Sequence, residues 1–486
     1  MPGDLFAFGP FQLDARARRL SRDGEALTLT GRQFDLLHLL VSRAGETLSK
    51  DFLIEAAWRD VAVTDNSLEQ VISSLRRMLT LPAGQPFIET QARRGYRFAA
   101  DVTRLDRRET DAALAALLAP HRAWIEGRAA LETLERGQIL GARTVFEDVL
   151  AHVPDQAAAH VGLANACAMQ FEMTRTDRAP DRAAIERALH HAREACRLDP
   201  QYGEAWATLG FVLDRTGRHA DAVAAVRRAV ALEGDNWRHR LRLSYAGWGE
   251  ERLREARRTL ALLPGCPLAH WLAASVYVAR QAVGEAEREL DAGIAAHGLA
   301  GTAPSRFSGV ALHWLLGLIH LSRGAFEEAR VALDRELADE HRGHLYAREC
   351  SANTWYAIGA LELRQGRVAA AGRAFEEAVQ RLPLHPMARV GLAAVQGTPG
   401  VAYARPSEPL EQHPSPVDRA VAHAAALLLT RTEEGRRRAV QLVDEALAAA
   451  PPGSAGWTIP LEPLLAVHTD PDGWAPVLVR LRSRAA

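Results

Sequence analysis

Arginine residues gather at two places within the first hundred positions of this chain. Arg76 and Arg77 are adjacent at the end of a segment with helical periodicity, and Arg93 and Arg94 lie in a turn between two short segments. A guanidinium group can donate two parallel hydrogen bonds to a phosphate, and its charge releases the counterions that surround a nucleic acid. This placement of charge favours contact with a nucleic-acid backbone.

Polar side chains recur at helical spacing ahead of Arg77, and Glu69 lies on the same outer face. Side chains of these types exchange hydrogen bonds with base edges in a major groove. With the arginines and one tyrosine they form the predicted DNA-binding set: Asn66, Ser67, Gln70, Ser73, Ser74, Arg76, Arg77, Arg93, Arg94 and Tyr96.

A second interpretation of the arginines stays open. Arg76 and Arg77 could stabilise only the carboxyl end of a helix through its dipole, while the other two could be solvated turn residues. DNA binding predicts that Arg77→Ala and Arg94→Ala each weaken duplex binding and reduce its salt dependence. Unchanged salt slopes in both variants would favour the second interpretation.

Short strands and a hairpin must flank the segment that carries these residues. Alternating apolar residues predict a small antiparallel sheet from residues 6–8, 11–13 and 26–29, with a turn at 22–25. A later hairpin is expected between residues 87–90 and 96–99, across the turn that holds Arg93 and Arg94.

Three helices are expected between the sheet and the hairpin, each starting at a polar N-cap. The N-caps are Thr30, with Gln33 completing a capping box, then Ser49, and then Asp65 or Asn66. Gly45 ends the first helix, residues 59–64 connect the second to the third, and Pro82 and Gly84 end the third. The buried stripes are Phe34, Leu37, Leu40 and Val41; Leu53, Ile54, Ala57 and Trp58; and Leu68, Val71, Ile72, Leu75 and Leu79.

Three motifs follow one another in this region: LTGRQFDLL at 29–37, VTDNSLEQVISSLRR at 63–77, and IET at 88–90 followed by RGYRF at 94–98. They resemble the winged-helix effector domain of OmpR/PhoB-type response regulators over roughly residues 5–104. The resemblance is strongest to the CadC/ToxR type. It implies that the third helix lies in the major groove, that the hairpin is a wing, and that Arg94 enters the minor groove.

The resemblance also bears on specificity and switching. Because the family often has a basic residue where Ser73 or Ser74 stands, it implies that base contacts rely more on Gln70, Arg77 and ordered water. About five residues precede the first strand, too few for a receiver domain, so we expect no aspartyl phosphorylation on this chain.

Small and large residues recur with a period of about 34 in the rest of the chain, and this pattern resembles tetratricopeptide repeats. The clearest units carry Trp206, Leu209, Gly210, Leu213, Gly217, Ala222, Val226 and Ala229, and then Trp355, Ile358, Gly359, Gly366, Ala371, Phe375, Ala378 and Pro383. A further unit carries Leu316, Gly317, Gly324, Ala329 and Leu333. Small residues let two helices approach closely, and units must stack because one alone cannot bury its apolar face. We expect about seven to nine units, interrupted by loops at 175–181 and 397–416.

The predicted fold is therefore mainly α: a small α+β winged helix-turn-helix domain followed by an α-solenoid of tetratricopeptide repeats. The expected segments are a winged-helix domain (1–104), a linker (105–122), the solenoid (123–452) and C-terminal capping helices (453–486). A repeat superhelix presents a concave face that binds proteins or peptides. In pairing these two modules the chain resembles HilA-like activators.

These observations predict a sequence-specific, DNA-binding transcription regulator whose repeats sense a ligand or dock a partner. Double-stranded DNA is the expected partner, and exposure of the DNA-binding domain, homodimerisation on tandem half-sites and recruitment of RNA polymerase stay open as outputs. The rival hypothesis is an interaction scaffold whose winged helix has lost DNA binding. The retained arginines argue against it.

Composition narrows the remaining classes of protein. The net charge is −1, so DNA affinity must come from local clustering rather than a global field. All basic residues except Lys50 are arginine, a bias that we attribute to genomic base composition. Without close cysteine spacings, a basic apolar leader or a long apolar run, we expect a cytoplasmic protein that does not enter a membrane.

Few residues suggest catalysis or a cofactor. His341 and His344 with Glu340 and Glu349 are a loose metal-like group that we interpret as an inter-repeat loop, and His190 and His191 as surface residues. The tryptophans at 206, 237, 271, 314 and 355 are expected to be core packing. Because no phosphate-binding loop, nucleophile elbow or paired-carboxylate motif is present, we expect no enzyme and no cofactor.

Overall fold

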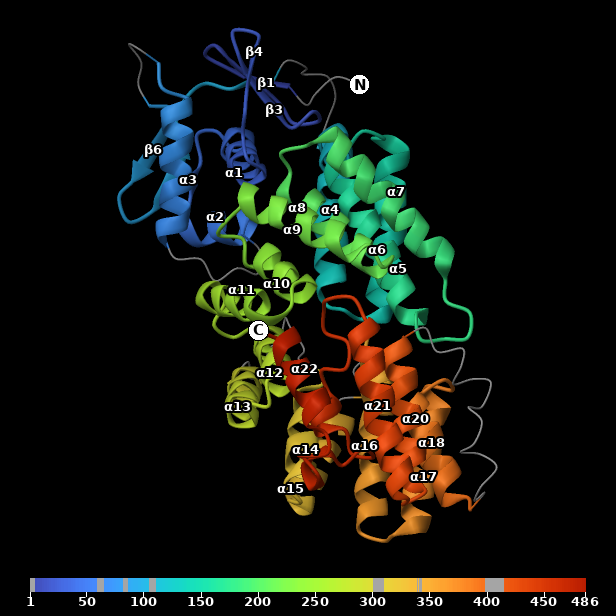
Figure 1. Cartoon of the computed structure of the whole chain (residues 1–486). Helices are drawn as coiled ribbons and strands as arrows, with labels where there is room; N and C mark the ends of the chain where they lie inside the picture. The colour runs from blue at the N-terminus through green and yellow to red at the C-terminus, as the bar shows by residue number, and fades with distance from the viewer. Residues whose placement is uncertain are drawn as a thin grey trace. The chain divides into compact units, whose positions relative to one another are not determined.

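A five-stranded antiparallel sheet opens the chain, in the order β4–β3–β2–β1–β8. Its strands β1, β3 and β4 are labelled in Figure 1. Its strands are β1 Leu5–Phe8, β2 Phe11–Asp14, β3 Arg19–Arg22, β4 Glu25–Leu27 and β8 Thr103–Arg104. Arg22 pairs with Glu25 across a two-residue loop in which Asp23 and Gly24 both have positive φ. That geometry matches the right-handed twist of the strands, so the predicted turn is confirmed.

The computed structural model describes residues 5–58, 65–81, 86–104, 111–299, 310–338, 340, 343–397 and 415–486. The chain forms two compact units. One consists of Met1–Ala130, Gly141–Ala166 and Arg187–His239, and the other of Leu131–Leu140, Cys167–Glu186 and Arg240–Ala486.

Three helices follow the first four strands: α1 Gly31–Ser42, α2 Lys50–Ala57 and α3 Asp65–Met78. Thr30 Oγ1 accepts a hydrogen bond from the Gln33 amide at 3.3 Å, and Gln33 Oε1 accepts one from the Thr30 amide at 2.9 Å. Ser49 caps α2, so both predicted starts are confirmed. The third start was wrong, since α3 already contains Asp65 and Asn66. Acidic residues favour the first helical turn as well as the cap, because they complement the helix dipole.

A three-stranded sheet closes this region in the order β5–β7–β6, with β5 Thr47–Leu48, β6 Ile88–Gln91 and β7 Gly95–Phe98. The predicted hairpin is β6–β7. Four phenylalanine rings, Phe8, Phe11, Phe87 and Phe98, join this hairpin to the five-stranded sheet with centroids 5.1–6.1 Å apart. The predicted apolar stripes of the three helices are buried, except that Ile54, Ala57 and Val71 are only partly buried.

Helices make up most of the remaining chain. They are α4 Asp111–Glu132, α5 Arg136–His152, α6 Ala157–Thr174, α7 Arg182–Leu198, α8 Gly203–Arg215, α9 His219–Leu232, α10 Trp237–Ala246, α11 Gly249–Leu262, α12 Pro267–Ala279, α13 Val283–Leu299, α14 Leu312–Ser322, α15 Phe326–Ala338, α16 Ala347–Arg364, α17 Val368–Arg381, α18 Pro386–Val395, α20 Pro416–Leu429 and α21 Glu433–Ala449. Consecutive helices pack as pairs, among them α8 with α9, α12 with α13, and α16 with α17.

The repeat signature has a direct packing cause within these pairs. A Cβ on Gly359 would lie 2.5 Å from the Phe375 ring, and one on Gly317 would lie 2.8 Å from Leu333. Each signature glycine thus admits the large side chain of its partner helix. Gly391 meets Phe375 in the same way, so one buried ring joins α16, α17 and α18.

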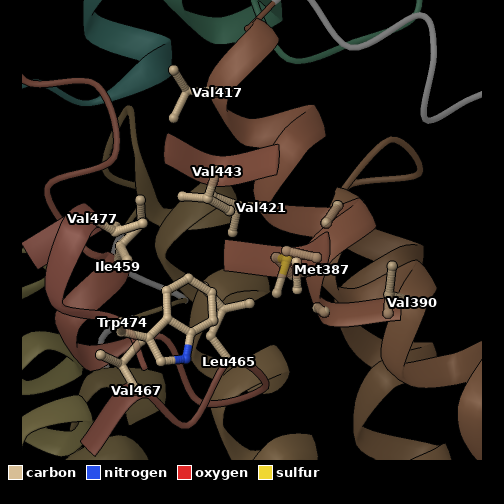
Figure 2. Packing of buried hydrophobic residues seen from close by; sticks show 14 of the residues in the cluster. Met387, Val390, Val417, Val421, Val443, Ile459, Leu465, Val467, Trp474 and Val477 are labelled. Carbon is tan, nitrogen blue, oxygen red and sulfur yellow. The ribbon is translucent and has the colours of Figure 1, made fainter. Parts of the chain in front are cut away.

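The last segment contains two short 3-10 helices, η2 Ile459–Leu461 and η3 Val467–Thr469, and one α-helix, α22 Ala475–Arg484. Trp474 and Val477 pack with Val421 and Val443 of α20 and α21, as a cap would (Figure 2). The same segment also lies against the first helices of earlier pairs, α12 and α14. Gln281, which follows α12, donates from Nε2 to the Leu478 carbonyl at 2.8 Å.

Several sequence-based predictions fall outside the described residues. These are the connector 59–64, the helix-ending Pro82 and Gly84, His341, and most of the loop 397–416. The loop at 175–181 is confirmed between α6 and α7, whereas α4 begins at Asp111, inside the segment expected to be a linker. The bounds of the four segments stay predictions.

Candidate nucleic-acid interface

Helix α3 has one buried and one exposed face. Leu68, Ile72 and Leu75 are buried, because they meet the other helices of the domain. Gln70 and Arg77 are exposed, and the exposed row also contains Glu69 and Ser73. Positions three and four apart share a helix face, so these side chains form one continuous polar strip.

Three of the predicted residues on α3 do not belong to the polar strip. Ser67 is partly exposed, whereas the Asn66 side chain lies outside the described residues. Ser74 faces α1 instead of the polar strip, because its Oγ accepts a hydrogen bond from Gln33 Nε2 at 2.8 Å. The same glutamine closes the capping box of α1, so Ser74 fixes α3 to the start of α1.

Arg76 faces the wing. Its Nε donates to the Ile88 carbonyl at 2.9 Å, and its NH2 group donates to Thr90 Oγ1 at 2.7 Å. The guanidinium also lies 5.7 Å from the centre of the buried Tyr96 ring. Arg76 and Tyr96 therefore join α3 to β6 and β7, and in this structure both are engaged within the domain.

The wing tip carries the second arginine cluster. Arg93 and Arg94 are exposed at the turn between β6 and β7, where Arg93 has a φ of 59° and the Arg94 amide donates to the Gln91 carbonyl at 2.9 Å. Gly95 follows with a φ of 126°, and a Cβ there would lie 1.9 Å from the Leu48 carbonyl oxygen. The close approach of β5 and β7 thus requires glycine beside the two arginines.

Sequence reasoning missed an ion pair on this surface. Lys50, the first residue of α2, donates from Nζ to Glu69 Oε1 at 2.8 Å. No local pattern links residues on separate helices, so the only available signal was that the single lysine and a carboxylate on the outer face both belong to this domain. A second pair joins Arg97 to Glu89 at 2.7 Å across the wing strands.

The other candidate groups that the structure describes have partners within the fold. Among the described residues no cluster of three or more His, Cys, Asp or Glu side chains could hold a metal ion. Glu340 pairs with Arg381, Glu349 pairs with Arg175, and burial lowers the pKa of His344 to about 4. The predicted tryptophan packing is confirmed, since Trp237 is buried and the other four pack against apolar clusters.

The prediction for His191 was wrong. His190 is exposed, but His191 faces α6, and its Nδ1 lies 2.9 Å from Nδ1 of His160. Burial and the neighbouring histidine lower the pKa of His191 to about 4. Two adjacent helical residues point about 100° apart, so one of them was bound to meet the neighbouring helix.

Comparison with known proteins defines the class of the first domain. Residues 24–98 match the family described as "Transcriptional regulatory protein, C terminal", and residues 128–186, 181–236 and 208–263 match tetratricopeptide repeats. The chain thus carries an OmpR/PhoB-type effector domain near its N-terminus, followed by tetratricopeptide repeats.

Two relatives share the first domain. The transcriptional regulator HilA of Salmonella typhimurium is 33% identical over 93 residues, which are 19% of this chain and 17% of HilA. The transcriptional activator CadC of Escherichia coli K12 is 35% identical over 91 residues, 18% of either chain. The match thus spans about a sixth of each relative.

One solved structure, titled the DNA binding domain of E. coli CadC, is 31% identical and matches with a TM-score of 0.20. The match covers 21% of this chain and 99% of that one.

None of the helices that the structure describes has both the length and the apolar character of a membrane-spanning segment.

Proposed function

We propose that this chain is a sequence-specific, DNA-binding transcription regulator. The observation that carries the proposal is one exposed polar strip, Gln70, Ser73 and Arg77, on the third helix of a domain whose relatives are transcription regulators. Two further exposed arginines extend from the wing of the same domain. Such a helix places its polar side chains against base edges in the major groove.

The predicted set divides into residues that contact DNA and residues that position them. Gln70 and Ser73 read bases, Asn66 and Ser67 lie at the end of the helix that enters the groove, and Arg77 binds phosphate. Arg93 and Arg94 enter or flank the minor groove, where positive charge is favoured. Ser74, Arg76 and Tyr96 position the reading surface, because their contacts lie within the domain.

The repeat region docks a protein partner in this proposal. The first helices of successive pairs, α14, α16 and α18, contact one another. The C-terminal segment covers part of this row, because η2 contacts α12 and α14, and α22 contacts α12. We therefore place the partner on surfaces of the repeats that the C-terminal segment leaves uncovered.

Footprinting of the full chain on the DNA around its own gene tests the proposal. We expect protection of a short site at dilute salt, and paired half-sites about 10 base pairs apart if two copies bind together. Addition of RNA polymerase distinguishes recruitment from dimerisation, since recruitment extends the protected region. An unprotected region at dilute salt, with a folded protein, would favour the scaffold hypothesis.

A further inference from the structure

We propose that Glu69, held by Lys50, is a specificity-determining residue that accepts a hydrogen bond from the exocyclic amine of a cytosine. The inference rests on the proposed function and deepens it. Glutamate accepts from cytosine N4 in the major groove, which distinguishes a C·G pair from the other pairs.

Glu69 lies where a base-reading residue must lie. It precedes Gln70 on α3, and its side chain is 51% exposed. Among the described residues of the exposed strip it is the one carboxylate. A bare carboxylate there would be repelled by the phosphates, so the strip needs either a nearby cation or a base that donates to the carboxylate.

The ion pair with Glu69 adds little to stability by itself. The lysine is the first residue of α2, where the helix dipole disfavours a positive charge. Exposed ion pairs also contribute little to folding, and both partners are partly exposed. The ammonium does have an evident use at a DNA surface, because it offsets the charge of Glu69 against the phosphates.

Lysine differs from arginine in what it leaves open on the carboxylate. An ammonium is a point charge, and here it binds Oε1 of Glu69, while Oε2 accepts no hydrogen bond from the described residues. A guanidinium fork would bind both oxygens in parallel. Lys50 is the chain's only lysine, so lysine stands where a carboxylate must keep one acceptor for a base.

Selection from a randomised duplex library, followed by anisotropy titrations on the selected site, tests this assignment with the full chain. The wild type is expected to prefer C·G at one position by roughly 5- to 150-fold. Glu69→Ala and Glu69→Gln abolish that preference, and Glu69→Ala strengthens binding to unrelated duplexes, because a repelling charge is lost.

Changes at Lys50 separate charge from geometry. Lys50→Arg is expected to keep affinity and salt slope but to lose most of the C·G preference. Lys50→Ala should weaken binding to every duplex, and this loss should shrink in the Glu69→Gln background. Lys50 is the only side-chain amine that acetylation can modify. Acetylation should therefore reproduce the effect of Lys50→Ala on binding. The Lys50→Arg variant resists acetylation and is the control.

Different experimental results would contradict the proposed function and the proposed role of Glu69. A wild-type chain that selects no duplex contradicts the proposed function. A wild-type chain that selects a site, while Glu69→Gln and Lys50→Arg select the same site with the same preferences, overturns only the role of Glu69. A change in thermal stability without a change in selection would likewise reduce the pair to a contact between α2 and α3.

Discussion

At the scale of single residues, the adjacent Arg76 and Arg77 show how one side-chain type serves two purposes. Neighbouring positions on a helix point about 100° apart. One guanidinium therefore binds the Ile88 carbonyl and Thr90 of the wing, and the other reaches solvent on the proposed DNA face. Their identical side chains gave no sign of this division, which follows from the position of the wing.

Arg76→Ala should destabilise the protein by about 1–3 kcal/mol, because it leaves the Ile88 carbonyl without its donor and frees the wing from α3. Arg77→Ala is the matched control and should change stability by less than about 0.5 kcal/mol, since its side chain is exposed. Urea unfolding monitored by circular dichroism measures both. Equal stabilities for the two variants would contradict the positioning role of Arg76.

At the scale of elements, local signals predicted most of the winged-helix domain. The capping box at Thr30, the cap at Ser49 and the Asp23-Gly24 turn are encoded within a few residues of one another. The strands β3, β5 and β8 escaped prediction. Two residues are too few for an alternating pattern in β5 and β8, and β3 carries a single apolar residue, Leu20. The roles of Ser74 and Lys50 escaped for a related reason, since their partners lie on other helices.

Gly95→Ala tests the junction of the wing with β5. The new Cβ would lie 1.9 Å from the Leu48 carbonyl oxygen, so the strands must separate. We expect a loss of at least about 2 kcal/mol in unfolding free energy. Gly45→Ala is the control, because Gly45 also has a positive φ but has no atom near its Cβ position. Backbone strain alone predicts that Gly45→Ala loses about 1 kcal/mol of unfolding free energy. Equal losses in Gly45→Ala and Gly95→Ala would show that the contact with Leu48 does not matter.

Phe375 and Gly359 test the cause of the repeat signature. Phe375→Ala should cost about 3–5 kcal/mol as a cavity opens, and Gly359→Ala about 1–3 kcal/mol through overpacking. The double variant should be more stable than the sum predicts, because removal of the ring makes room for the new methyl group. Strict additivity in calorimetry would show that the two positions are not coupled.

In the molecule as a whole, residues 453–486 make contacts that their own sequence pattern did not predict. Their apolar pattern predicted a cap, and α22 does pack on α21, yet η2 and α22 also contact α12, and η2 contacts α14. That return needs partners roughly two hundred residues away, such as Arg280, which donates to the Ala485 carbonyl at 2.8 Å. No periodicity within the segment encodes such a contact.

One buried carboxyl makes this segment sensitive to pH. Burial raises the pKa of Glu462 from about 4.5 to about 7, with Asp418 adding to the shift, while hydrogen bonds from Tyr356 and the Leu464 amide oppose it. Tyr356 in turn lies beside His385. A raised pKa in the folded state gives stability that is present below pH 4.5 and is lost as the pH rises to about 7.

Glu462→Gln should therefore be more stable than the wild type at pH 8, by up to about 3 kcal/mol, and little different at pH 5. Thermal melts of both proteins across this range measure the difference. The variant must fold at pH 5 for the comparison to hold, which the same melts check. A difference in stability that stays constant between pH 5 and pH 8 would contradict a raised pKa of Glu462 in the folded state.

The salt dependence of duplex binding tests whether Arg77 and Arg94 contact DNA phosphates. The logarithm of the affinity of the full chain should fall linearly with the logarithm of salt concentration, and Arg77→Ala and Arg94→Ala should each reduce the slope by about 1. Arg19→Ala removes an exposed arginine from the other sheet and should leave the slope unchanged. Identical slopes in all four proteins, or no binding in dilute salt, would contradict the account.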